Sequence, residues 1–194
     1  MHPGSTAVYL GVVQEMKLLG VIITSDLKWH RNTENITIKA YKRLWILKRL
    51  KQMGASTATL IDVYTKHVRS VLEFAAVVWS SSLTKENSMT IERVQKSAFS
   101  VIIGSRYQTY EEACGNLNME TLAMRREKLC LKFATKSFNH SIHKQWFVQY
   151  QDDTITRSQK PYLNPVQGRT ERLLKSAIPY LTNLLNKKMS SVPL

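Results

Sequence analysis

Cysteine is scarce in this chain, and Cys114 and Cys130 do not form a C-x-x-C pair. A disulfide framework or a zinc ribbon is therefore not expected, and a reducing intracellular compartment, nuclear or cytoplasmic, fits this usage best. Long apolar runs are also lacking, since no stretch approaches the roughly 18–20 residues that a membrane-spanning helix needs. The first residues show no basic segment followed by an apolar one, so neither a secretory signal nor a membrane partner is expected.

Motifs of catalysis are lacking as well. The sequence has no P-loop, no G-x-G-x-x-G and no Ser-His-Asp pattern, and its 5 histidines show no ligand spacing with cysteine or acidic residues. The pair Asp152 and Asp153 lies in a polar stretch without a third acid nearby, so a solvated turn is favoured over a two-metal site. We expect no catalytic residue, metal site or cofactor in this chain alone.

Acidic residues are few, with 14 Asp and Glu against 28 Lys and Arg, which gives a net charge of +14. Such an excess favours a polyanionic partner, above all nucleic acid. A basic surface that is merely solvated is the alternative. An anionic membrane surface is less favoured, because the amphipathic helices can cover one another's apolar faces.

The pattern of apolar residues predicts three regions. In residues 1–30, the β-rich runs STAVYLGVV and KLLGVIIT, separated by QEM, predict a hairpin with Gly20 inside its second strand. Residues 31–140 read as helices that are capped by Ser56 or Thr57, Thr84, Thr109 and Thr121 and stopped by Gly54 and Gly104. Residues 141–194 read as a basic linker with a last helix near 179–188. The predicted fold class is mainly α, a short β-hairpin followed by four to five helices and a loop-rich basic tail.

Several side chains have a predicted environment. The second helix is expected to bury the residues Leu60, Val63, Tyr64, His67, Val71, Ala75 and Val78, and the helix after Thr121 to bury Leu122, Leu129, Phe133 and Ala134. Trp45 and Trp79 are expected in the core, with base stacking as the lesser alternative.

Positive charge is concentrated on two of the predicted helices. The first helix carries Lys39, Lys42 and Arg49 away from its apolar stripe. The helix after Thr121 carries a ridge made of Arg125, Lys128, Lys132 and Lys136. Such rows can follow the phosphates of a nucleic acid, although Lys and Arg are also ordinary surface residues whose stems cover apolar seams.

Five stretches, in order, resemble the C-terminal part of the reverse transcriptases of non-LTR (LINE-like) retrotransposons. They are KLLGVIITSDLKWHRNTENITIKAYKRLWILKRLK, VYTKHVRSVLEFAAVVWSSSL, IERVQKSAFSVIIG, YEEACGNLNMETLAMRREKLCLKFATK and RTERLLKSAIPYLTNLLN. The chain departs from the family pattern at Ser70, Phe74, Ser97 and Ser100.

The resemblance implies that Lys17, Leu19 and Gly20 belong to a primer grip, where a glycine lets the backbone approach the primer end. It also implies that the helices form a thumb on the backbone of an RNA–DNA hybrid. The family's catalytic strand with its paired aspartates is absent, so the chain is interpreted as a C-terminal remnant without activity of its own. The alternatives are a helical protein-interaction module that associates through exposed apolar surface, a polymerase completed by a longer product or in trans, and a decayed copy without a role.

Overall fold

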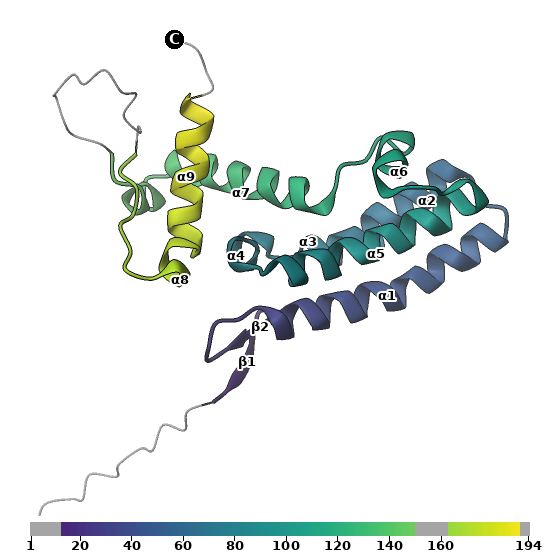
Figure 1. The fold of residues 1–194 in the computed structure, drawn as a ribbon, viewed down its shortest axis with the longest axis horizontal. Helices are drawn as coiled ribbons and strands as arrows, with labels where there is room; N and C mark the ends of the chain where they lie inside the picture. Colours follow the sequence, from purple (N-terminus) through teal and green to yellow (C-terminus); the bar gives the residue numbers. More distant parts are fainter. Residues whose placement is uncertain (1–12, 150–162, 191–194) are drawn as a thin grey trace, which may run out of the picture.

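The computed structural model describes residues 13–149 and 163–190 and shows a small hairpin followed by helices (Figure 1). The elements in chain order are β1 (Glu15–Leu18), β2 (Val21–Thr24), α1 (His30–Gln52), α2 (Thr57–Val63), η1 (Tyr64–Arg69), α3 (Ser70–Glu73), α4 (Ala76–Trp79), η2 (Ser80–Ser82), α5 (Lys85–Ile103), η3 (Gly104–Arg106), α6 (Tyr110–Asn116), α7 (Leu122–Phe138), η4 (His143–Trp146), α8 (Glu171–Leu174) and α9 (Ala177–Ser190). The predicted fold class, mainly α with an N-terminal hairpin, is confirmed, and α9 confirms the predicted last helix. The run STAVYLGVV up to residue 12 and the pair Asp152 and Asp153 lie outside the described residues.

The hairpin differs in register from the prediction. β1 and β2 are antiparallel with Leu18 opposite Val21, so the turn is the pair Leu19 and Gly20. Both turn residues have positive φ, 47° and 89°, as a two-residue type I′ turn requires. The prediction of a turn at QEM with Gly20 inside a strand is therefore wrong, since Glu15 and Met16 belong to β1 and the glycine forms the turn.

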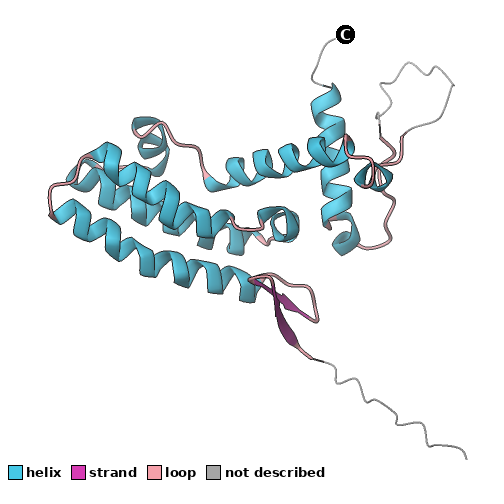
Figure 2. Ribbon diagram, turned by 180° about the vertical axis from the view of Figure 1, so that it is seen from behind, coloured by secondary structure: helices cyan, strands magenta, loops and turns pink. Residues whose placement is uncertain are grey.

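The core is built where α1 lies along α5 (Figures 1 and 2). The sequence predicts an apolar stripe of Ile36, Ala40, Leu44, Leu47 and Leu50 on α1. The first four are buried, and Leu50 is partly buried against the same core. α1 ends at Gln52 and is capped by Met53. Gly54 follows with φ 81°, a left-handed conformation typical of the predicted helix stop. The hairpin contributes to the same core, whose members include Val21 and Trp29.

A π-helical segment, η1, changes which side of the second helical region is buried. The buried residues are Leu60, Tyr64, Val68, Leu72 and Ala76, each four positions after the last. A π-helical turn is wider than the 3.6-residue turn of an α-helix, so the buried positions drift away from the predicted face. The expected burial of His67 is therefore wrong, and Val63, Val71 and Ala75 are only partly buried. Val78 is likewise half exposed.

The chain turns sharply between α3 and α4. Ala75 has φ 52°, and the indole N–H of Trp79 donates a hydrogen bond of 3.0 Å to the carbonyl oxygen of Phe74. Trp79 is fully buried, which confirms its predicted place in the core.

The predicted caps are confirmed. Ser56, Thr84, Thr109 and Thr121 each accept a hydrogen bond from the backbone N–H three positions on. Such a side chain satisfies one of the four backbone donors that every helix start leaves free. Gly104 ends α5 with φ 73°.

A second, smaller core lies where α9 crosses α7 (Figure 1). Its buried residues are Cys130, Ala134, Phe147, Leu163, Leu181, Leu184 and Leu185. The side-chain amide of Asn186 donates to the carbonyl oxygen of Leu163 at 2.9 Å and accepts from its N–H at 2.8 Å. The packing thus groups the second half of α7 with the C-terminal region, whereas the predicted domains were 1–30, 31–140 and 141–194. Phe133, expected to be buried, is 37% exposed.

Candidate nucleic-acid interface

The outer face of α1 carries cations and aromatic rings together. At about 100° per residue, Lys42, Trp45 and Arg49 fall within about 60° of one another, on the side opposite the buried stripe. All three are exposed, as is Tyr41 one turn earlier. We call Tyr41, Lys42, Trp45 and Arg49 the α1 outer face, and Lys39 lies exposed at its edge.

Trp45 is the largest departure from the predicted core. It is 64% exposed, and the guanidinium carbon of Arg49 lies 5.8 Å from the centre of its ring. An arginine over an indole face is a cation–π contact. The sequence held a signal for this exposure, because Trp45 falls outside the stripe of Ile36, Ala40, Leu44 and Leu47.

Other cations of α1 are engaged in holding the fold together. Arg31 pairs with Glu15 and Glu34, which raises the pKa of its guanidinium. Arg43 donates to the carbonyl oxygen of His67 at 2.7 Å, and Lys51 donates to that of Ile102 at 2.9 Å. Among the described residues, Lys39, Lys42 and Arg49 have no carboxylate partner. These three predicted cations are therefore available to an anionic ligand.

The predicted ridge on α7 is divided. Arg125 forms a two-pronged ion pair with Glu73, one arm of which is 3.0 Å, and this hydrogen bonding raises the pKa of the arginine. The two side chains are 26% and 14% exposed, and Arg69 lies 3.8 Å from the same carboxylate. Arg125 thus joins α7 to α3. Lys128 pairs with Glu120 at the surface.

The far end of the ridge stays open. Lys132 and Lys136 are exposed and line a shallow hollow of about 440 Å³ together with Lys128, Thr135 and Lys188 of α9. The ammonium of Lys188 lies 3.5 Å from the hydroxyl of Thr135. This end of α7 gathers several positive charges that an anion can approach.

The two basic groups are not adjacent. α5 packs against both α1 and α7, and the ribbon views place it between them (Figures 1 and 2). The sequence predicts one nucleic-acid-binding role for seven cations of α1 and α7, and the structure distributes these cations over two separate surfaces.

The hairpin turn lies against the protein itself. A Cβ added to Gly20 would meet the ring of Phe74 at 3.3 Å, so the glycine is needed both for its positive φ and for this close packing. Leu19 is 89% exposed, and Lys17 is exposed in β1. The three predicted primer-grip residues therefore lie at one end of the hairpin, Lys17 in β1 and the other two in the turn, and the contact that explains Gly20 is internal.

A buried polar network attaches the start of α7 to α5. The carboxylate of Glu92 accepts hydrogen bonds from the backbone N–H groups of Leu122 and Ala123, at 3.2 and 2.6 Å, and from the hydroxyl of Tyr110 at 2.5 Å. A carboxylate at a helix N-terminus satisfies free donors and complements the helix dipole. Arg126, 4% exposed, lies 3.8 Å from the same carboxylate, and burial lowers its pKa.

Gln95 extends this network. Its side-chain amide donates to the hydroxyl of Tyr110 and to the carbonyl oxygen of Glu120, each at 2.9 Å, and accepts from the hydroxyl of Tyr64 at 2.6 Å. Burial raises the pKa of both tyrosines. Sequence reasoning missed the network, although Glu92 and Gln95 belong to the motif IERVQ of the resemblance. In the structure these motif residues hold helices together.

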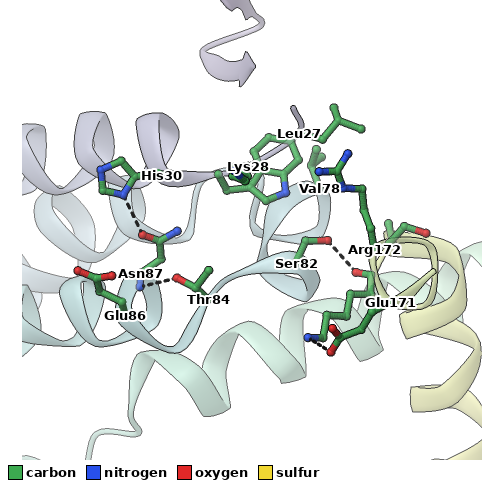
Figure 3. A pocket seen from close by; sticks show the side chains of 14 residues that line it. Leu27, Lys28, His30, Val78, Ser82, Thr84, Glu86, Asn87, Glu171 and Arg172 are labelled. Carbon is green, nitrogen blue, oxygen red and sulfur yellow. Dashed lines mark hydrogen bonds and ion pairs between the residues drawn. The ribbon is translucent and has the colours of Figure 1, made fainter. Parts of the chain in front are cut away.

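A hollow of about 550 Å³ lies between the end of the hairpin and α8 (Figure 3). Leu27, Trp29 and Val78 supply apolar lining, and several of its polar groups contact one another. His30 contacts the side-chain carbonyl of Asn87 at 3.3 Å. The hydroxyl of Ser82 donates to the carbonyl oxygen of Lys175 at 2.7 Å, which joins η2 to α8. Figure 3 shows these contacts along the wall of the cleft.

No family model, curated protein or solved structure matches the chain. The resemblance to reverse transcriptases therefore stays a prediction that depends on its motifs. Within residues 13–149 and 163–190, no group of three or more His, Cys, Asp or Glu is placed to hold a metal ion. In the same ranges, no helix combines the length and apolarity that a bilayer crossing requires.

Proposed function

We propose that this chain binds nucleic acid through its sugar–phosphate backbone, without reading sequence, as the thumb-like part of a non-LTR reverse transcriptase. The observation that carries the proposal is the α1 outer face with Lys39 at its edge. There, exposed cations stand without carboxylate partners in the described structure, beside an exposed tryptophan. Ammonium and guanidinium groups that meet phosphates release condensed counterions, which makes such binding favourable and dependent on salt.

The electrostatics of the chain support the same ligand. The net charge of +14 attracts a polyanion from a distance. The cations that meet it are a subset, because Arg31, Arg43, Lys51 and Arg125 already have partners inside the protein. The open end of α7, Lys132 and Lys136, offers a second and separate contact.

We further propose that the chain has no polymerase activity alone, because the paired aspartates of the family's catalytic strand are absent from its sequence. A primer-extension assay with Mg²⁺ on a primed RNA template tests this, and we expect no extended product. An extended product from the purified chain would overturn this part of the proposal.

The test of binding is a salt series with an RNA–DNA hybrid, a DNA duplex and a single strand. The variant K39Q/K42Q/R49Q removes three charges from α1. We expect it to weaken binding and to reduce the slope of log affinity against log salt by about two to three, since each phosphate contact contributes about 0.7–0.9.

The matched control is K66Q/K175Q/K187Q. It removes the same formal charge from exposed lysines that have carboxylate partners, Asp62, Glu171 and Glu127. We expect a much smaller change of slope. Equal loss in the two triple variants would mean that only total charge matters, and binding insensitive to salt would contradict the proposal.

A second candidate function is binding of a protein, including a second copy of this chain. The cleft between the hairpin and α8 favours it, because apolar side chains there are open to solvent, with Leu27 52% and Val78 50% exposed. Light scattering over a concentration series distinguishes the two functions. Val78→Glu would abolish association at the cleft, whereas a monodisperse monomer at all concentrations would contradict association.

A further inference from the structure

The α1 outer face carries more aromatic surface than phosphate binding needs. Trp45 is 64% and Tyr41 43% exposed, and Ile38 one turn earlier is 48% exposed. A tryptophan is among the most costly side chains to leave in water, because its burial removes roughly 150–250 Å² of mostly apolar surface. The exposed ring therefore calls for a partner with a flat, apolar face.

The charges around the rings limit what that partner can be. Lys42 and Arg49 flank Trp45, with Lys39 and Lys48 exposed at the two edges. The one acidic residue of α1, Glu34, is paired with Arg31. A second copy of this chain would bring a like-charged helix against this one, which is unfavourable. A ligand that combines negative charge with flat rings matches both features.

Nucleic acid has both features, and only unpaired bases expose their faces for stacking. We propose that Tyr41 and Trp45 form a stacking platform for the bases of a single-stranded nucleic acid. Lys42 and Arg49 would contact its phosphates. This proposal rests on the function proposed above. The chain would then prefer single strands to duplexes at this face.

The spacing of the two rings fits a stacked strand. Residues four apart in an α-helix are about 6 Å apart along the axis. Successive phosphates of one strand are about 3.4 Å apart along a duplex, so two steps are about 7 Å. Tyr41 and Trp45 can therefore meet every second base. In the free protein the guanidinium of Arg49 lies over the indole, and it would leave the ring to contact a phosphate when a base stacks there.

The test compares a labelled oligothymidine of about 16 nucleotides, within the range that single-strand binding surfaces cover, with a duplex of the same length. The variants are Trp45→Ala, Trp45→Phe and, as the matched control, Met53→Ala. Met53 is 80% exposed at the end of the same helix. These side chains lie outside the core, so all variants should fold, and circular dichroism checks this.

We expect Trp45→Ala to weaken binding of the single strand by about tenfold or more, the equivalent of ~1–3 kcal/mol of base stacking. Binding of the duplex should change less than about twofold, because its contacts are to phosphates. Trp45→Phe should keep most of the affinity, since a ring remains, and Met53→Ala should behave as the unmodified chain.

Three results would overturn the inference in different ways. Equal affinity of Trp45→Ala and the unmodified chain for the single strand would remove the stacking role while leaving backbone binding in place. No binding of any nucleic acid at low salt would remove the proposed function as well. A dimer in light scattering that Trp45→Ala dissociates would assign the face to a second copy of the chain.

Discussion

α1 and α7 are the two helices on which the sequence concentrates positive charge, and the structure uses the two in different ways. On α1, Lys39, Lys42 and Arg49 point away from the core without carboxylate partners in the described structure. On α7, Arg125 is paired with Glu73 and Lys128 with Glu120. Two helices with similar sequence patterns thus differ in how many of their charges a ligand could reach.

The difference shows that the neighbours of a helix decide what its basic row can do. α7 starts beside Glu92, Glu73 and Glu120, so its first cations are drawn into the fold. The outer face of α1 has no acidic element packed on it in the described structure, and its rings and cations face solvent. A count of Lys and Arg residues alone would treat the basic rows of α1 and α7 as equal.

The largest effect should come from removing the carboxylate that anchors α7. Glu92→Ala would leave Arg126 with a buried charge and no counterion, and would free the N–H groups of Leu122 and Ala123. We expect a loss of about 3–5 kcal/mol in the free energy of unfolding, as for other broken buried pairs. Denaturant unfolding measures it.

The control for this variant is Glu86→Ala. Glu86 is an exposed acidic residue in the first turn of α5, the helix that also carries Glu92. It should cost no more than about 1 kcal/mol, the size of a helix-dipole contribution. Equal losses in the two variants would mean that the network of Glu92 contributes nothing specific.

The second-largest effect should come from Arg125, and it tests whether the basic row of α7 differs from that of α1. Arg125→Gln breaks the pair with Glu73, which is largely buried, and should reduce the free energy of unfolding by about 2–3 kcal/mol, below the ~3–5 kcal/mol of a fully buried pair. The salt slope of nucleic-acid binding should stay unchanged. An unchanged free energy of unfolding together with a lower salt slope would mean that Arg125 contacts the nucleic acid.

A smaller effect concerns the open end of α7. The variant K132Q/K136Q should lower the salt slope by at most about one to two, since two phosphate contacts are at stake. Its effect on affinity should be below that of K39Q/K42Q/R49Q. A larger effect than the α1 variant would place the main interface on α7 and reverse the comparison.

The smallest effect should be that of Lys128→Gln. Its partner is Glu120, but the lysine side chain is 64% exposed, and exposed pairs contribute about 0–1 kcal/mol. Thermal unfolding in low and high salt should give nearly the same midpoint for this variant and the unmodified chain. A large shift would show that this surface pair stabilises the fold as the pair of Arg125 does.

The sequence could predict those parts of the fold that depend on local chemistry. The caps at Ser56, Thr84, Thr109 and Thr121 were visible because a cap joins residues only three apart. The stripe of α1 was visible because its period is regular. The hairpin was placed with the wrong turn, because only the structure shows that two residues of positive φ connect the strands.

The candidate site was harder to predict, because it depends on contacts far apart in the sequence. Glu73 and Arg125 are 52 positions apart, so no local pattern could show that Arg125 is engaged. The π-helical η1 shifted the buried face away from His67, and no regular period predicts such a segment. Trp45, in contrast, could have been recognised from its position opposite the stripe.

Each hydrophobic core has one of the two free cysteines in it or at its margin. The reactivity of each thiol can therefore report on the opening of its own core. Cys114 packs at the margin of the larger core, and Cys130 is fully buried in the smaller one, 3.2 Å from the hydroxyl of Ser80. Burial raises the pKa of both thiols, and the thiolate is the reactive form. A thiol reagent should therefore modify Cys114 first and reach Cys130 only when α9 separates from α7. The ratio of the two labelling rates would then report, without any engineered probe, how independently the C-terminal helix opens from the rest of the chain.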